Sequence, residues 1–106
     1  MSEESWPYRF VVTLERQRSQ HSDATWYLVL LPFPVADELD ADAPLRGGFG
    51  SVPVQARIGS SVWRTSVFPT KETFLLLVNK KVRVTESLTV GAPVEVALRL
   101  RHAGGG

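Results

Sequence analysis

Alternating hydrophobic and polar positions recur along most of the chain and predict β-strands. Residues 8–14 alternate apolar with other side chains, which is typical of a strand with one buried face. The polar stretch 16–24 predicts an exposed turn. Residues 25–31 then form an unbroken apolar run that predicts a central strand covered on both faces. Pro32 and Pro34 end this strand, because proline cannot continue a hydrogen-bonded ladder.

Residues 50–69, GSVPVQARIGSSVWRTSVFP, have the pattern of a hairpin. The predicted turn is Gly59-Ser60, with glycine at the first position, where a positive φ is needed. The first arm should bury the side chains of Val52, Val54, Ala56 and Ile58. The returning arm places Trp63, Thr65 and Val67 on one face, and Arg64, Ser66 and Phe68 on the other. Pro53 should lie at a sheet edge or turn its nitrogen away from a neighbouring strand.

Two segments suggest short helices. Residues 35–43 are compatible with one or two turns, in which the acidic residues lie near the start and suit the helix dipole. Residues 79–91 would use Val82 and Leu88 as apolar anchors if helical, whereas Val84 and Thr85 disfavour a helix.

Further strands are expected over 73–78 and 94–100, which brings the total to about six or more. Together with one or two short helices they predict a mainly β fold, a small β-barrel or pseudo-barrel. We expect a single domain over residues 1–106, with its core at about 8–100 and a flexible tail at 101–106. A chain with enough strands to close its own barrel is expected to be a monomer.

The amino-acid composition and net charge limit which classes of protein and which kinds of site are possible. Among 106 residues, 43% are hydrophobic and 22% charged, a balance typical of one globular domain. The net charge of +1 gives little long-range attraction to nucleic acid or anionic membranes, although a local basic patch is compatible with it. With no cysteine, disulfides, thiolate nucleophiles and cysteine-based metal sites are excluded. The acidic start and the short, proline-interrupted apolar runs predict a soluble cytoplasmic protein without membrane association.

Several longer motifs resemble an uncharacterised bacterial family, a domain of unknown function. The segments GFGSVPVQARIGSSVWRTSVFP, LLVNKKVR and LTVGAPVEVAL are similar to its patterns G-x-V-P-V-x-A-x-I-G, W-R-T-S-x-F-P, L-P-V-x-K-x-V-R and V-G-D. The amino-terminal W-Y-x-V-x-L-P pattern also matches, so the resemblance covers residues 8–100. It implies a double-split β-barrel like that of AbrB and MazE DNA-binding proteins. Some members of this family are fused to a YdeI-like, OmpD-associated bacteriocin-protection domain.

The sequence contains no recognisable set of catalytic residues, so we predict that the protein is not an enzyme. The sequence contains no G-x-S-x-G nucleophile elbow, and His21 and His102 fall in a polar loop and the tail. The acidic run 37–43 lacks the spacing of a calcium loop, so it is read as a solvated helix surface and no metal site is expected. The glycine-rich stretch 46–51 precedes a strand, whereas phosphate loops precede a helix, so no cofactor is expected.

Aromatic residues admit two readings. Trp26, Trp63 and Phe68 could form an apolar pocket, but aromatics at strand spacing more often belong to the core. Trp6 would either cap a barrel end or remain exposed. An exposed apolar patch around Trp6 and the acidic helix would indicate a protein-interaction module.

Basic residues give the strongest functional hypothesis. If they meet on one surface, they could hold a small anion, with a hydroxyl donating a further hydrogen bond. The alternative is that they only keep the surface soluble. The candidate ligand-binding residues are Arg57, Arg64, Thr65, Ser66, Lys80, Lys81 and Arg83.

The expected function is therefore a non-catalytic binding or accessory domain for a small anionic ligand or a protein partner. Nucleic-acid binding through Arg57, Arg64, Lys80, Lys81 and Arg83 is the alternative, by analogy with AbrB-like barrels.

Overall fold

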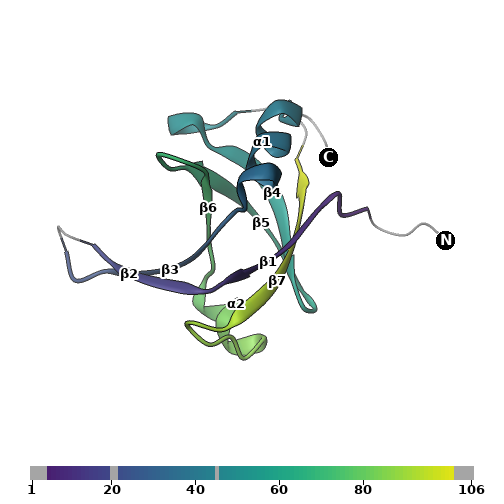
Figure 1. The fold of residues 1–106 in the computed structure, drawn as a ribbon. Coiled ribbons are helices and arrows are strands. Elements are labelled where there is room, and N and C mark those ends of the chain that lie inside the picture. The colour runs from purple at the N-terminus through teal and green to yellow at the C-terminus, as the bar shows by residue number, and fades with distance from the viewer. Residues whose placement is uncertain (1–4, 20–21, 45, 102–106) are drawn as a thin grey trace.

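The computed structural model describes residues 5–19, 22–44 and 46–101, and these fold around one curled antiparallel sheet (Figure 1). Within this part of the chain the sheet has seven strands in the order β1-β7-β4-β5-β6-β3-β2. The strands are β1 (Tyr8–Thr13), β2 (Glu15–Arg18), β3 (Thr25–Leu30), β4 (Val52–Ile58), β5 (Ser61–Pro69), β6 (Phe74–Leu77) and β7 (Pro93–Leu100). The predicted mainly β class is confirmed, in the form of a half-barrel.

Two α-helices and a short 3-10 helix complete the described structure: α1 (Phe33–Asp42), α2 (Lys80–Thr85) and η1 (Gly48–Gly50). The two α-helices lie at opposite ends of the curled sheet (Figure 1). Neither they nor η1, taken over the described residues, are long and apolar enough to cross a membrane.

Leu14 is the point at which the sheet curls back on itself. The two edge strands, β1 and β2, are separated only by this residue, yet β1 pairs with β7 and β2 pairs with β3. The Leu14 N–H donates to the Ala92 carbonyl at 3.2 Å, and the Leu14 carbonyl accepts from the Gly91 N–H at 2.9 Å. Its side chain is only 1% exposed. One bent segment therefore supplies both edges of the half-barrel.

The predicted hairpin is confirmed. Ile58 pairs with Ser61, which leaves Gly59-Ser60 as a two-residue turn, and Gly59 has φ +59°. The inward side chains of β4 are all buried, namely Val52, Val54, Ala56 and Ile58.

Pro53 lies in a central strand, so the edge alternative is wrong, and its nitrogen is turned away from β5 only. Its carbonyl accepts from the Arg101 N–H at 3.1 Å, so its backbone polar groups face the side of β7 rather than β5. The β4–β7 register begins at Val54 opposite Leu100, so proline removes a donor only at the end of that ladder.

The core fills the inner side of the curl. Each fully buried valine or leucine contributes about 1.5–3 kcal/mol relative to an exposed one. The residues with no measurable exposure on the inner faces of the central strands are Val52, Val54, Ala56, Val67, Leu76, Val96 and Leu98, together with Val29 of β3.

The predicted turn over residues 16–24 is wrong in its first part, because β2 occupies Glu15–Arg18. This strand forms by backbone pairing with β3, and three of its four side chains are exposed, so no apolar alternation marks it. The β2–β3 hairpin extends away from the body of the half-barrel (Figure 1). For that reason β3 is covered on both faces only in its second half, and Trp26 is 48% exposed.

Helix α1 is longer than expected and begins earlier. Pro32 is its N-cap and Pro34 lies in its first turn, where the missing N–H has no intrahelical partner to lose. Its first turn contains no acidic residue, so the expected dipole stabilisation is wrong. The helix is held instead by burial of Ala36 and Leu39.

A hydrogen bond also joins α1 to the sheet. The Tyr8 hydroxyl donates to Asp42 Oδ2 at 2.5 Å. Burial of the phenol, followed by this contact with the Asp42 carboxylate, raises the pKa of Tyr8 far above its usual value.

Helix α2 forms despite Val84 and Thr85 but covers only Lys80–Thr85, so the helical alternative for residues 79–91 holds in the first half of that segment. The Asn79 side chain caps it by accepting from the Val82 N–H at 2.9 Å, a stabilisation of about 1 kcal/mol. Val82 is buried within α2, and Leu88, which follows the helix, packs against the core. Cap and anchors together outweigh the modest propensity cost of the β-branched residues.

Glu86, at the end of α2, is hydrogen-bonded to the β4–β5 turn. Its Oε2 accepts hydrogen bonds from Ser61 Oγ at 2.6 Å and Ser60 Oγ at 3.3 Å. These bonds, led by that from Ser61, lower the pKa of Glu86.

We predict that Gly59→Ala lowers the free energy of unfolding by roughly 1–2 kcal/mol. Alanine at position 59 would have to adopt a positive φ, which is strained for any residue with a Cβ. Its Cβ would also lie 1.9 Å from Glu86 Oε1 and so would displace the carboxylate from its serine partners. Gly48→Ala is the matched control, because its Cβ meets nothing within 4 Å and its φ is not positive. Urea unfolding measures both; equal effects of the two substitutions would contradict the prediction.

We also predict an acid-dependent role for Glu86. Because its folded pKa is lowered, its stabilising effect is complete above the unfolded pKa of about 4.5 and is lost as pH falls through the folded pKa. Between about pH 7 and pH 3 the free energy of unfolding should therefore fall less for Glu86→Gln than for the wild type. Urea titrations at a series of pH values give the comparison, and parallel pH profiles would rule the effect out.

Candidate functional site

Arginine side chains gather on the outer surface of four neighbouring strands. Residues directly opposite each other in an antiparallel pair lie on the same face of the sheet. Ala97 of β7 is opposite Arg9 of β1 on one side and Arg57 of β4 on the other, so these three residues form a row. A second row runs through Arg99, Gln55 and Arg64, on β7, β4 and β5.

Arg101 continues the outward positions of β7 beyond the second row. Its Nη2 donates to the Thr65 carbonyl at 2.7 Å, which draws the side chain across β4 toward β5. We call Arg9, Arg57, Arg64, Arg99 and Arg101 the arginine face. Among the outward positions that the structure describes on these four strands, Glu95 is the acidic one.

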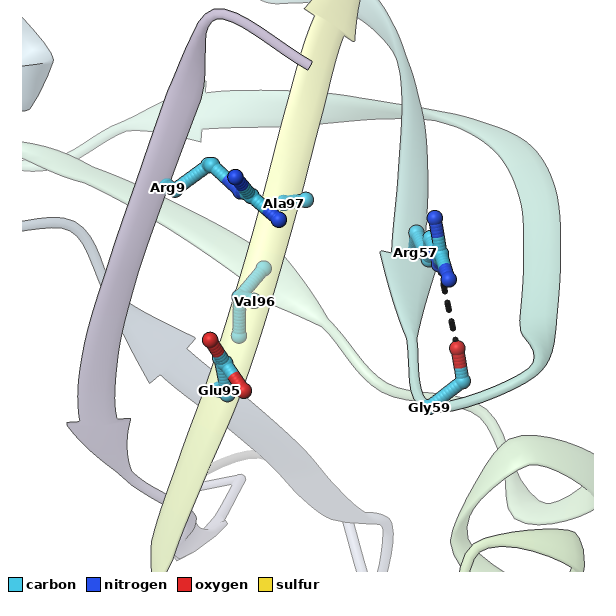
Figure 2. Close-up of a pocket in the computed structure, with 6 residues that line it drawn as sticks. All are labelled: Arg9, Arg57, Gly59, Glu95, Val96 and Ala97. Carbon is cyan, nitrogen blue, oxygen red and sulfur yellow. Dashed lines mark hydrogen bonds between the residues drawn. The ribbon is translucent and has the colours of Figure 1, made fainter. Parts of the chain in front are cut away.

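The arginine face is hollowed between Arg9 and Arg57 (Figure 2). The hollow has a volume of about 210 Å³ and is also lined by Gly59, Glu95, Val96 and Ala97. It exists because the short Ala97 side chain stands between two long ones in the row. Arg57 is oriented by its own turn, since its Nε donates to the Gly59 carbonyl at 3.1 Å. The hollow thus presents guanidinium groups from two strands and a carboxylate from a third.

Trp6 supports the arginine face from beneath. The Arg99 guanidinium lies 4.4 Å from the centre of its ring and that of Arg57 lies 6.0 Å away, both within cation–π range. Arg99 Nε also donates to Gln55 Oε1 at 2.6 Å. Trp6 is 8% exposed, and its indole N–H is buried without a hydrogen-bond partner among the described residues. The alternative in which Trp6 remains exposed in an interaction patch is therefore wrong, because Trp6 is buried with the guanidinium groups of Arg99 and Arg57 over its ring.

A second hollow opens where strand β6 ends. It has a volume of about 380 Å³ and lies between residues 25–27 of β3 and residues 63–65 of β5, with Leu77, Val78, Asn79 and Arg83 at its end. We call it the gap. The Arg83 guanidinium lies 3.6 Å from the centre of the Tyr27 ring, and its Nε donates to the Val78 carbonyl at 3.2 Å. A cation and an aromatic ring are thus fixed together at the gap.

The seven candidate residues do not converge on one site. Arg57 and Arg64 belong to the arginine face, while Arg64, Thr65 and Arg83 line the gap. Ser66 lies opposite Pro53 on the outer face and lines neither hollow. Lys80 and Lys81 are exposed on α2 and line neither hollow.

Sequence reasoning missed Arg9, Arg99 and Arg101. The alternation of β1 and β7 does identify all three as outward positions. It gives no information about which strands are neighbours, so their meeting with Arg57 could not be foreseen.

The aromatic and acidic candidates lie in different parts of the structure. Trp26 and Trp63 both line the gap, whereas Phe68 lies elsewhere and is 36% exposed, so the core reading fails for Trp26 and Phe68. In the acidic run, Asp40 forms an ion pair with Arg46. No group of three or more metal-ligating side chains is found within residues 5–19, 22–44 and 46–101. His21 and His102 lie outside the described residues.

A family model described as a domain of unknown function, DUF1905, matches residues 10–98. No curated protein matches the chain.

We predict that Trp6→Ala lowers the free energy of unfolding by roughly 3 kcal/mol, because it empties a buried site beneath two arginines. Trp26→Ala removes the same side chain from a half-exposed position and should cost about 1 kcal/mol or less. Chemical denaturation followed by circular dichroism measures both variants. A smaller effect at residue 6 than at residue 26 would show that Trp6 does not support the face.

Proposed function

The chain belongs to the DUF1905 family, a domain of unknown function, and we propose that it is a non-catalytic binding module for an anionic ligand. The binding surface is the arginine face, centred on the hollow between Arg9 and Arg57.

The observation that carries this proposal is the segregation of charge. Arginine is the side chain best suited to phosphate and carboxylate groups, because its planar guanidinium donates paired hydrogen bonds and keeps its charge. Five arginines share one surface, whereas Asp37, Glu38, Asp40 and Asp42 lie on α1. A net charge of +1 thus conceals a strongly positive face.

The hollow also suggests the chemical class of ligand. Arg9 and Arg57 would hold the anionic group, and the Glu95 carboxylate would accept a hydrogen bond from a hydroxyl or amino group of the same molecule. A small phosphorylated metabolite that carries hydroxyl groups fits this combination. Guanidinium and carboxylate groups at this surface provide charge pairing and hydrogen bonding, which supports a binding role over a catalytic one.

Nucleic acid is the second candidate ligand, and the extent of the arginine face favours it. Arginines occur from β1 to β5 across four adjacent strands, a width of about 14 Å at the usual strand spacing. One phosphate group would not span that width, whereas successive phosphates of a single strand would. The resemblance to double-split barrels of DNA-binding proteins points the same way, as an analogy of fold.

We extend the proposal to a monomer in the bacterial cytoplasm. The resemblance to a bacterial family supports the setting. One chain supplies all seven strands of the described sheet, which supports the monomer.

We predict that Arg9→Ala and Arg57→Ala each weaken binding of pyrophosphate or of a short single-stranded oligonucleotide by roughly tenfold. Arg16→Ala is the matched control, because Arg16 is an exposed arginine on β2, away from the arginine face. Isothermal titration calorimetry measures affinity, and its dependence on salt separates the ligands. Oligonucleotide affinity should fall steeply with salt, and each lost phosphate contact should reduce the slope of log affinity against log salt by about 0.7, the value for single strands.

Two results would contradict the proposal. One is equal weakening by Arg16→Ala, which would reduce the effect to net charge. The other is failure of both probes to bind at about 50 mM salt, where phosphate contacts are strongest.

A further inference from the structure

We propose that the gap is a docking site for an extended acidic peptide from a partner protein, which adds a short strand between β3 and β5 in line with β6. This site meets the arginine face at Arg64, but the proposal does not depend on anion binding at the hollow between Arg9 and Arg57.

The lining shows that the gap passes through the sheet. Tyr27, Trp63 and Thr65 project to the inner side, whereas Trp26 and Arg64 alternate with them and project outward. A hollow lined by consecutive residues of two strands is therefore a missing piece of sheet rather than a depression on one surface. Its origin is the length of β6, which has four residues between the six of β3 and the nine of β5.

The backbone of β3 is directed into the gap. The Val78 N–H donates to the Tyr27 carbonyl at 2.8 Å, so the polar backbone groups of Tyr27 face β6. Alternation turns those of Thr25 to the same side, beyond Leu77, the last residue of β6. Among the described residues, no backbone partner occupies that side of Thr25.

The backbone of β5 is directed into the gap from the opposite side. Ile58 and Ser61 close a two-residue turn, so this pair and every second pair after it hold the β4–β5 hydrogen bonds. Arg64 belongs to the other set, and its N–H and carbonyl point away from β4. The β5–β6 register begins only at Val67, which leaves the Arg64 groups without a backbone partner in the described chain.

Charge and aromatic surface define what the added strand must carry. Neither Arg64 nor Arg83 has an ion-pair partner within the described residues, and Arg83 is held against Tyr27 by its Val78 hydrogen bond. A carboxylate on the inner side of the peptide would meet Arg83 next to the Trp63 ring. The following residue would face outward along the half-exposed Trp26. Backbone pairing gives the affinity, and these alternating side chains give the specificity, as in other strand-addition complexes.

The test begins with a random peptide library displayed on phage and selected against the full chain. We expect the enriched peptides to share an acidic residue at a fixed position. A synthetic copy of the leading peptide should slow hydrogen exchange of the Thr25 and Arg64 amides, measured by NMR. Arg64→Pro removes the edge donor and should weaken this peptide by roughly tenfold more than Arg64→Ala, which removes only the side chain.

Charge recognition is tested by combining a substitution in the protein with a substitution in the peptide. Arg83→Gln should weaken the acidic peptide but not a copy in which alanine replaces the acid, whereas Arg9→Ala should affect neither. If Arg64→Pro fails to fold, amide protection in the wild-type chain decides the question.

The proposal is overturned if no peptide is enriched, or if the bound peptide leaves the Arg64 amide unprotected. It is also overturned if light scattering shows a dimer that Arg64→Pro dissociates, because the occupant would then be a second copy of this chain.

Discussion

The hydrogen bonds of Leu14 to residues 91 and 92 determine the shape of the molecule. They hold one continuous segment so that its first half pairs with β7 and its second half with β3. Without this switch the sheet would have two distant edges and one open face. With it, the same seven described strands enclose an apolar interior and expose a convex surface. Inner and outer positions therefore carry different chemistry along β4 and β7.

The convex surface acquires its charge through register. Ala97 stands between Arg9 and Arg57, and Gln55 stands between Arg99 and Arg64, so strands from three parts of the sequence build one positive face. Trp6 is buried beneath Arg57 and Arg99, where ring and guanidinium groups orient one another. The acidic residues of α1 lie on a separate element, so the positive face is not neutralised by them.

The gap forms because helix α2 begins shortly after strand β6 ends. Asn79 caps α2, which turns the backbone out of the sheet directly after β6. The flanking strands continue without a partner, and sheets with open edges are sites of strand addition. The arginine face and the gap share β5 and its Arg64, but the gap also uses the free backbone edge of that strand.

The sequence by itself determined every described strand except β2, together with the hairpin turn and the faces of β4, β5 and β7. These features depend on local alternation and on the φ of one glycine, and both are visible in a single chain. It did not reveal β2, whose mostly exposed side chains carry no alternation, or the early start of α1. Only the tertiary structure decided which arginines become neighbours and where β6 leaves the sheet unpaired. The first outcome depends on the order and register of strands far apart in the chain. The second depends on the local Asn79 cap together with the longer strands that come to flank β6.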